Sequence, residues 1–168
     1  MNKIEYQNII DQLKHKVFRF ARTLLNNNTD AEDITQDVME KFWRQKDQLK
    51  DINNIESYVI QSTKHLCYDH LRRKMVIVKN NESLMHTQNV STNDDENVEK
   101  PEDIKNIIRL AINQLPEKQK TIMHLRDIEG YDFEEIASIT NLEINAIRVN
   151  LSRARQSVRD ALIKNKSL

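Results

Sequence analysis

The chain has very few of the residues that interrupt helices or build tight turns. One glycine, Gly130, and two prolines, Pro101 and Pro116, occur in 168 residues. Sheet-rich folds need turn residues at short intervals, and phosphate-binding loops need glycines where the backbone approaches a phosphate. The shortage therefore disfavours a dinucleotide-binding fold, a P-loop and the strand-to-helix turn that carries a catalytic serine.

Cysteine and long apolar runs are also scarce. The single cysteine, Cys67, excludes an intramolecular disulfide and is typical of a reducing cytosol. No apolar run approaches the roughly 20 residues of a transmembrane helix. Charged residues begin at Lys3, and no apolar signal region follows the initiator methionine. We therefore expect a cytoplasmic protein without membrane insertion.

The motifs of common enzyme centres are missing as well. The sequence contains no HExxH motif, no Cys-x-x-Cys pair and no glycine-rich loop. His65, Cys67 and His70 are potential metal ligands, but they alternate around a helix and no fourth ligand of usual spacing lies nearby. We therefore expect no catalytic residue, no cofactor and no metal, with Cys67 buried as a small apolar side chain.

The net charge of zero results from cancellation between three segments. Residues 1–75 carry a net charge of +2, residues 76–103 carry −5, and residues 104–168 carry +3. The middle segment lacks helical periodicity and is poor in large apolar residues, which is typical of a flexible linker. The outer segments have apolar residues at helical spacing. The sequence predicts an all-α fold with two small helical domains, joined by a flexible acidic linker.

Capping signals predict where the helices begin and end. Thr29 with Glu32 has the spacing of a capping box, and Asn53 with Glu56 has the matching spacing before the next helix. In the second domain, Pro101 and Pro116 are predicted to start helices, and Gly130 is predicted to end one. Asp132 and Glu135 are predicted to cap the short helix that follows.

Residues 134–155, with the sequence EEIASITNLEINAIRVNLSRAR, have the pattern of a helix-turn-helix. Asn141 lies at the turn, where asparagine tolerates the left-handed conformation. With Ile147 and Leu151 facing inward, the outer face carries side chains able to reach base edges and phosphates in a major groove. These are Asn145, Arg148, Val149, Ser152, Arg153 and Arg155. We predict DNA binding; a merely solvated basic face is the alternative.

An acidic stripe is predicted on the helix that contains DAEDITQDVMEKFWRQ. Its inner positions are Ala31, Ile34, Val38 and Phe42, and its outer positions are Glu32, Asp33, Gln36, Asp37 and Glu40. Asp33, Asp37 and Glu40 lie at i, i+4 and i+7, and like charges at this spacing do not stabilise a helix. Carboxylates also do not attract phosphate. The stripe favours a basic protein partner, and an ordinary solvated face is the alternative.

A third stretch, NIESYVIQSTKHLCYDHLRRK, combines aromatic and basic side chains on one predicted helix. They are Tyr58, Lys64, His65, Tyr68, Arg72 and Arg73. Such a mixture suits stacking on unpaired bases with cations along the backbone. The alternative is that four of these side chains are structural, with Tyr58 or Tyr68 in the core.

These three stretches, in this order, resemble a sigma factor of the extracytoplasmic-function (ECF) class of the sigma-70 family. FARTLLNNNTDAEDITQDVMEKFW resembles regions 2.1 and 2.2, the third stretch above resembles regions 2.3 and 2.4, and the segment that begins LPEKQK resembles region 4. The resemblance implies promoter-directed transcription initiation, with core RNA polymerase and promoter DNA as partners. An anti-sigma factor is a usual further partner in this family.

The resemblance also implies roles for individual residues. Region 2.2 docks on the clamp helices of the largest polymerase subunit, which implies contacts by Asp33, Gln36, Asp37 and Glu40. Regions 2.3 and 2.4 melt and read the minus-10 element, which implies contacts by Asn53, Tyr58, Lys64, His65, Arg72 and Arg73. Region 4 reads the minus-35 element, which implies contacts by the outer face of the last helix. The alternatives are a stand-alone regulator that binds an operator as a dimer, and a protein-binding module.

Overall fold

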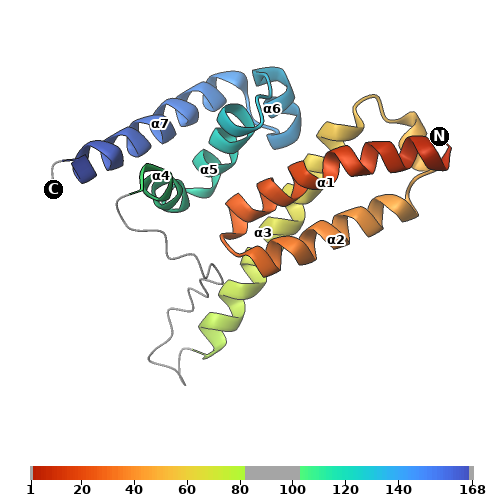
Figure 1. Cartoon of the computed structure of the whole chain (residues 1–168), viewed down its shortest axis with the longest axis horizontal. Helices are drawn as coiled ribbons and strands as arrows, with labels where there is room; N and C mark the ends of the chain where they lie inside the picture. The colour runs from red at the N-terminus through yellow and green to blue at the C-terminus, as the bar shows by residue number, and fades with distance from the viewer. Residues whose placement is uncertain (1, 82–102, 167–168) are drawn as a thin grey trace. The chain divides into compact units, whose positions relative to one another are not determined.

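The computed structural model of the chain describes residues 2–81 and 103–166, with the side chain of residue 166 left out (Figure 1). The chain divides into two compact units, Met1–Glu96 and Asn97–Leu168. Within the described residues every regular element is helical, which confirms the predicted all-α class. The first unit contains α1 (Lys3–Leu25), α2 (Asn28–Arg44), η1 (Gln48–Asp51) and α3 (Ile55–Asn81). The second contains α4 (Ile104–Asn113), α5 (Glu117–Met123), the π-helical turn η2 (His124–Ile128), α6 (Phe133–Thr140) and α7 (Ile144–Lys166).

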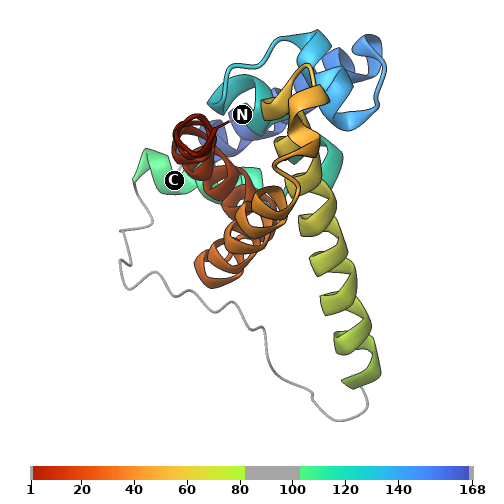
Figure 2. The ribbon, with the colours of Figure 1, turned by 90° about the vertical axis from the view of Figure 1, so that its right-hand side faces the viewer.

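In the first unit α1, α2 and α3 pack side by side around one apolar core (Figures 1 and 2). The fully buried side chains include Val17, Phe20, Ala31, Val38, Phe42, Val59, Ile60 and Cys67. They recur at three- and four-residue spacing along each helix, so one stripe per helix is removed from water. The inner stripe predicted for α2 is confirmed, because Ala31, Ile34, Val38 and Phe42 are all buried.

The connection between α1 and α2 differs from the prediction. Asn26 adopts a left-handed conformation (φ 50°) that ends α1, and the Asn27 side chain accepts a hydrogen bond of 2.9 Å from the backbone N–H of Asp30. Thr29 is therefore inside α2, and the predicted Thr29–Glu32 capping box is wrong. Asparagine is at least as good an N-cap as threonine, and it also tolerates the left-handed region, so the asparagine run supplies both helix ends.

The start of α3 is displaced from its predicted position by one residue. The Asn54 side chain, rather than that of Asn53, accepts a 3.0 Å hydrogen bond from the backbone N–H of Ser57. Glu56 instead forms an ion pair of 2.6 Å with Lys16 on α1. The tertiary contact outcompetes the local capping pattern.

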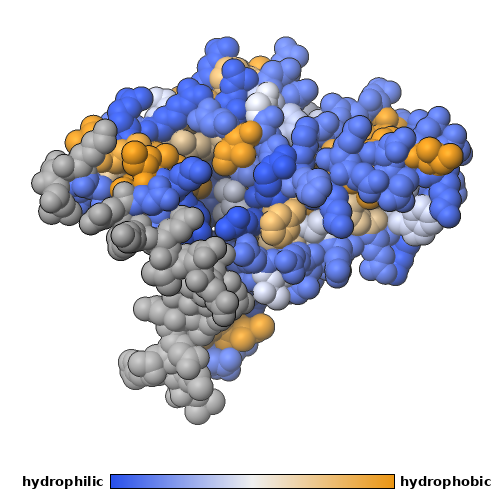
Figure 3. Space-filling model, viewed as in Figure 1, coloured by the Kyte–Doolittle hydropathy of each residue, from blue (hydrophilic) through white to orange (hydrophobic). Residues whose placement is uncertain are grey.

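The helix α3 is longer than predicted, because it continues to Asn81 and includes residues 76–81 of the predicted linker. No glycine or proline lies between Ile55 and Asn81 to end it. Figures 1 and 2 show its last turns extending beyond α1 and α2, and Figure 3 shows hydrophobic surface at this end of α3. Just before the extension, Lys74 and His70 of α3 both contact the Asp30 carboxylate at the start of α2. The rest of the predicted linker, 82–102, and the predicted helix start at Pro101 lie outside the described residues.

The second unit encloses its own core between α5, η2, α6 and α7. Its fully buried side chains include Ile122, Leu125, Ile136, Ile139, Ile147 and Ala154. Pro116 precedes α5, and Gly130 (φ 77°) lies just after η2, as the sequence predicted. The Asp132–Glu135 capping box at the start of α6 is present with both of its hydrogen bonds, of 2.8 and 3.0 Å.

Replacement of Asn141 by alanine should destabilise the second unit. Asn141 holds a left-handed conformation (φ 58°) at the end of α6, and a Cβ without a local hydrogen-bonding group costs about 1 kcal/mol there. Asn141→Gly removes the steric cost and serves as the control. Urea unfolding followed by circular dichroism should rank glycine at or above asparagine and alanine below both. Equal midpoints for the alanine variant and the parent chain would contradict this account of the turn.

Candidate nucleic-acid interface and acidic ridge

The helices α6 and α7 form the predicted helix-turn-helix. Asn141 ends α6 in the left-handed conformation, and the backbone N–H of Leu142 donates to the Thr140 hydroxyl at 3.3 Å within the turn. The helix α7 begins at Ile144. Three residues therefore separate the two helices, which is the short connection that this motif requires.

The face of α7 that the core leaves free carries the residues predicted to reach DNA. Ile147, Leu151, Ala154 and Val158 are buried, so the side chains between them point to solvent. The six predicted residues are all exposed: Asn145, Arg148, Val149, Ser152, Arg153 and Arg155. Their predicted exposure is confirmed, and their contacts with bases remain a prediction.

Two arginines on this face are held by side chains that precede α7 in the chain. The Arg148 guanidinium lies 5.3 Å from the centroid of the Phe133 ring, and Arg126 lies 4.7 Å from the same ring. Arg155 donates a bidentate pair of hydrogen bonds to the Asp127 carboxylate, with N···O distances of 3.0 and 2.5 Å. This bond raises the pKa of Arg155 further above its ordinary value. Sequence reasoning missed Asp127 and Phe133, because their partners are 28 and 15 residues away.

The acidic residues of α2 form a continuous exposed surface, which we call the acidic ridge. It consists of Glu32, Asp33, Gln36, Asp37 and Glu40, all of which are exposed. Glu40 pairs with Arg44 at 3.1 Å, and both side chains are more than half exposed, so the pair is strongly screened. Asp33 and Asp37 form no ion pair with any residue that the structure describes. Asp30 does not belong to the ridge, because it contacts α3.

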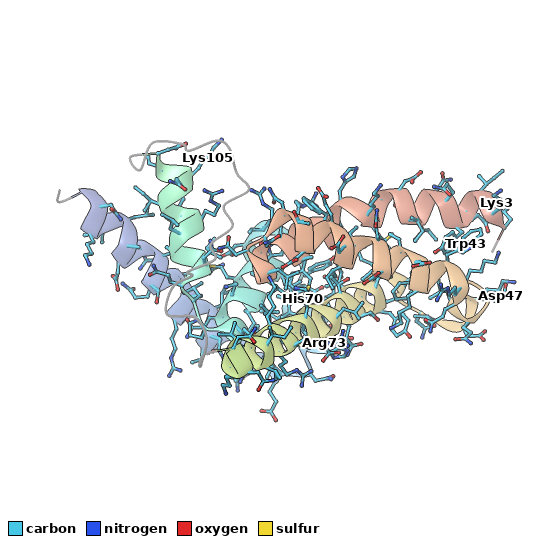
Figure 4. All side chains as sticks on the ribbon, turned by 90° about the horizontal axis from the view of Figure 1, so that it is seen from below. Lys3, Trp43, Asp47, His70, Arg73 and Lys105 are labelled. Carbon is cyan, nitrogen blue, oxygen red and sulfur yellow. The ribbon has the colours of Figure 1, made fainter. Side chains whose placement is uncertain are left out.

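The third predicted surface, on α3, is only partly available. His65, Arg72 and Arg73 are exposed, Tyr58 is half-buried with its ring 5.4 Å from that of Phe42, and Asn53 is exposed just before the helix. Arg72 contacts the neighbouring Asp69. Burial and the charge of Lys64 lower the pKa of His65, which favours the uncharged imidazole. Figure 4 shows Arg73 and His70 along the same helix.

Lys64, also predicted to contact the minus-10 element, is buried in the structure. Its side chain is 7% exposed, and burial lowers its pKa. Lys64 follows Ile60 by four residues and precedes Cys67 by three, which places it on the face of α3 that packs into the core. The sequence analysis grouped Lys64 with the DNA-facing residues because of its residue type. Helical geometry places it on a different face of α3 from the exposed His65.

The three potential metal ligands on α3 do not converge. Cys67 is buried in the core, His65 is exposed, and Nε2 of His70 lies 3.1 Å from the Asp30 carboxylate. Among the residues that the structure describes, no group of three or more His, Cys, Asp or Glu side chains is arranged to hold a metal ion.

The comparisons with known proteins decide between the alternatives left by the sequence. Residues 9–76 match the family described as Sigma-70 region 2, and residues 105–158 match Sigma-70, region 4. The chain belongs to the sigma-70 family. A stand-alone helix-turn-helix regulator and a simple protein-binding module each leave one of the two regions unexplained.

Curated relatives place this sigma factor in the ECF class. The chain is 29% identical over 96% of its length to the ECF RNA polymerase sigma factor SigE of Mycolicibacterium smegmatis, of which it spans 63%. It is 25% identical over 94% of its length to the ECF RNA polymerase sigma factor SigW of Bacillus subtilis, of which it spans 88%. Its fold resembles that of the sigma factor RpoE from Bartonella quintana in complex with the anti-sigma factor NepR. That match has a TM-score of 0.76 at 20% identity and covers 94% of this chain and 96% of RpoE.

The thiol of Cys67 should be unreactive in the folded sigma factor. Burial raises the pKa of Cys67 to about 12, so almost no thiolate is present at pH 8. A colorimetric disulfide reagent such as DTNB should modify the chain at a rate that follows unfolding and rises with urea. Rapid stoichiometric modification of the native chain would contradict the burial of this side chain.

Proposed function

We propose that this ECF sigma factor binds core RNA polymerase through its acidic ridge and contacts promoter DNA through α3 and α7. The observation that carries the proposal is the separation of charge on the helical faces: α2 presents carboxylates, whereas α7 presents arginines. The two faces cannot serve the same ligand, because one repels phosphate and the other attracts it. A protein that must bind both a protein machine and DNA needs both faces.

The acidic ridge is the proposed docking surface for polymerase. Asp33, Asp37 and Glu40 are stacked along one stripe, an arrangement that costs an isolated helix a few tenths of a kcal/mol. A complementary basic surface on the polymerase removes this repulsion and adds charge-assisted hydrogen bonds. Gln36, exposed between the carboxylates, contributes a neutral donor and acceptor at the same surface.

The exposed stripe of α3 is the proposed surface for the minus-10 element. Tyr58, His65 and Arg72 follow one another at seven-residue spacing and therefore share a face. An aromatic ring, an imidazole and a guanidinium are all groups on which an unpaired base can stack. Arg73 and Asn53 provide further contacts to the phosphate backbone and the base edges. Lys64 is not part of this surface.

The outer face of α7 is the proposed reader of the minus-35 element. Arg148 and Asn145 lie in its first turns, where a recognition helix meets base edges in the major groove. Val149 presents an apolar surface suited to a thymine methyl group. Ser152, Arg153 and Arg155 are the proposed phosphate contacts.

The proposed role also concerns chemistry, location and regulation. We propose that the chain has no chemistry of its own and takes no cofactor, because the family acts by binding polymerase and DNA. We place it in the cytoplasm, beside the polymerase. Among the described residues no helix is long and apolar enough to cross a bilayer. An anti-sigma factor is a proposed regulator, since the structural relative RpoE is bound to one.

Reversal of charge at Asp37 should weaken binding to core polymerase at least about tenfold, because Asp37→Lys places a cation against a basic partner surface. Asp37 is exposed, so the fold should survive. Asp11→Lys makes the same change on an exposed site of α1 and serves as the control. Fluorescence anisotropy with labelled sigma factor measures the affinity. Equal affinities for the two variants would argue against the ridge.

Removal of Arg148 should lower transcription from the cognate promoter about tenfold, because a base contact contributes about 1–3 kcal/mol and tenfold lies in the lower part of that range. The promoter can be identified by sequencing the transcripts that appear on overexpression. Run-off transcription with core polymerase measures the effect, and Lys164→Ala, at an exposed position far along α7, is the control. In Arg148→Ala the preference between promoters that differ at one minus-35 base should also diminish. Unchanged preference and yield would contradict base reading by Arg148.

A further inference from the structure

A basic hollow overlaps the proposed minus-35 surface and extends along α7 to Arg159, beyond the predicted contacts. It has a volume of about 340 Å³ and is lined by Phe133, Arg148, Ser152, Arg155, Gln156 and Arg159. Arg148, Ser152, Arg155 and Arg159 recur at spacings of four, three and four, so they form one stripe along α7. Three guanidinium groups and a hydroxyl converging on one open hollow are suited to an anion.

The ion pair between Arg155 and Asp127 leaves part of the guanidinium available. Asp127 accepts from Nε and from one N–H of Nη2. A guanidinium has five N–H donors, so both donors of Nη1 and the second donor of Nη2 remain. Those donors form the terminal edge of the fork, which is the edge that binds a phosphate with two parallel hydrogen bonds. The Asp127 contact therefore fixes the orientation of the guanidinium without occupying that edge.

The Phe133 ring restrains the other end of the stripe. Arg148 and Arg126 both lie against this ring, and Nη1 of Arg126 also donates to the carbonyl oxygen of Tyr131 at 2.9 Å. Asp127 lies in η2, and Phe133 is the first residue of α6. Both elements pack into the core of the unit. The rigid part of the fold thus limits the freedom of two long side chains on α7.

We propose that the hollow binds one backbone phosphate of promoter DNA, with Arg155 and Arg159 as its ligands, and that Asp127 is the residue that positions Arg155 for this contact. The inference rests on the proposed function, because it assumes that α7 lies on the minus-35 element. A carboxylate close to a phosphate repels it, so Asp127 would weaken DNA binding if it acted by charge alone. As a positioning residue it strengthens binding, since Arg155 loses less side-chain freedom when the complex forms.

The opposite signs of these two effects provide the first test. In holoenzyme assembled with core polymerase, Asp127→Asn should weaken promoter binding by between about twofold and tenfold. Glu134→Gln removes an equal charge from an exposed position in the first turn of α6 and is the matched control, which should bind the promoter equally or more tightly. In an Arg155→Ala background, Asp127→Asn should no longer weaken binding. If Asp127→Asn bound the promoter more tightly than the parent chain, as the Glu134→Gln control is allowed to do, the positioning role would be overturned.

A scan of the DNA backbone provides the second test. Promoter duplexes that carry one uncharged methylphosphonate linkage at successive positions around the minus-35 element are bound to the same holoenzyme. One linkage should weaken binding by the parent chain, and the same linkage should have no effect on Arg155→Ala. A penalty that persists unchanged in both Arg155→Ala and Arg159→Ala would overturn the assignment of these ligands.

Titration of inorganic phosphate into the free chain distinguishes a promoter phosphate from a free phosphate compound. Saturable binding that disappears in Arg155→Ala, combined with a scan in which no linkage matters, would overturn the assignment to DNA. Failure of the chain to form any promoter complex with polymerase would instead refute the proposed function, and the inference with it. An intact complex whose methylphosphonate scan is flat refutes the inference alone.

Discussion

The burial of one apolar stripe on each helix determines which charged side chains this sigma factor presents to its partners. In α2 the inward positions are Ala31, Ile34, Val38 and Phe42. Because a helix repeats every 3.6 residues, their burial leaves the carboxylates of the acidic ridge no direction except outward. In α7 the burial of Ile147, Leu151 and Ala154 has the same consequence for its arginines. Rotation of either helix by one residue would bury charge and expose the core.

The distribution of charge within the first unit separates its two proposed ligands. The ridge on α2 repels DNA, whereas α3 offers Arg72, Arg73 and His65. Asp30, at the start of α2, is an exception because it lies against His70 and Lys74 of α3. Burial of its carboxyl works to raise the pKa of Asp30, but the hydrogen bonds and charges of Lys74 and His70 outweigh this and lower it. One carboxylate of this helix is thus used to hold the unit together, while the ridge remains available to a partner.

Features that depend on periodicity could be predicted from the sequence, and features that depend on competition between contacts could not. The stripes of α2 and α7 and the capping box at Asp132 needed only helical geometry and local hydrogen bonding. The Thr29 box failed because Asn27, two residues earlier, was a competing cap, and Glu56 pairs with Lys16, which is 40 residues away. The burial of Lys64 was not foreseen because its residue type was weighed without its position on the helix. The continuation of α3 to Asn81, past the predicted start of the linker at residue 76, was not foreseen because the linker was assigned by the net charge of a whole segment whose acidic residues begin only after Asn81.

The contacts around α7 show why low sequence identity is compatible with the same fold. The RpoE match shares 20% of its residues with this chain but superimposes over almost its whole length. The buried stripes require only apolar residues of suitable size at the right spacing, so many sequences satisfy them. The pairs Asp127–Arg155 and Phe133–Arg148 are specific, since each needs two particular side chains brought together by the fold. A shared core therefore places α7 without fixing the directions of its arginines, and pairs such as these fix those directions in this chain.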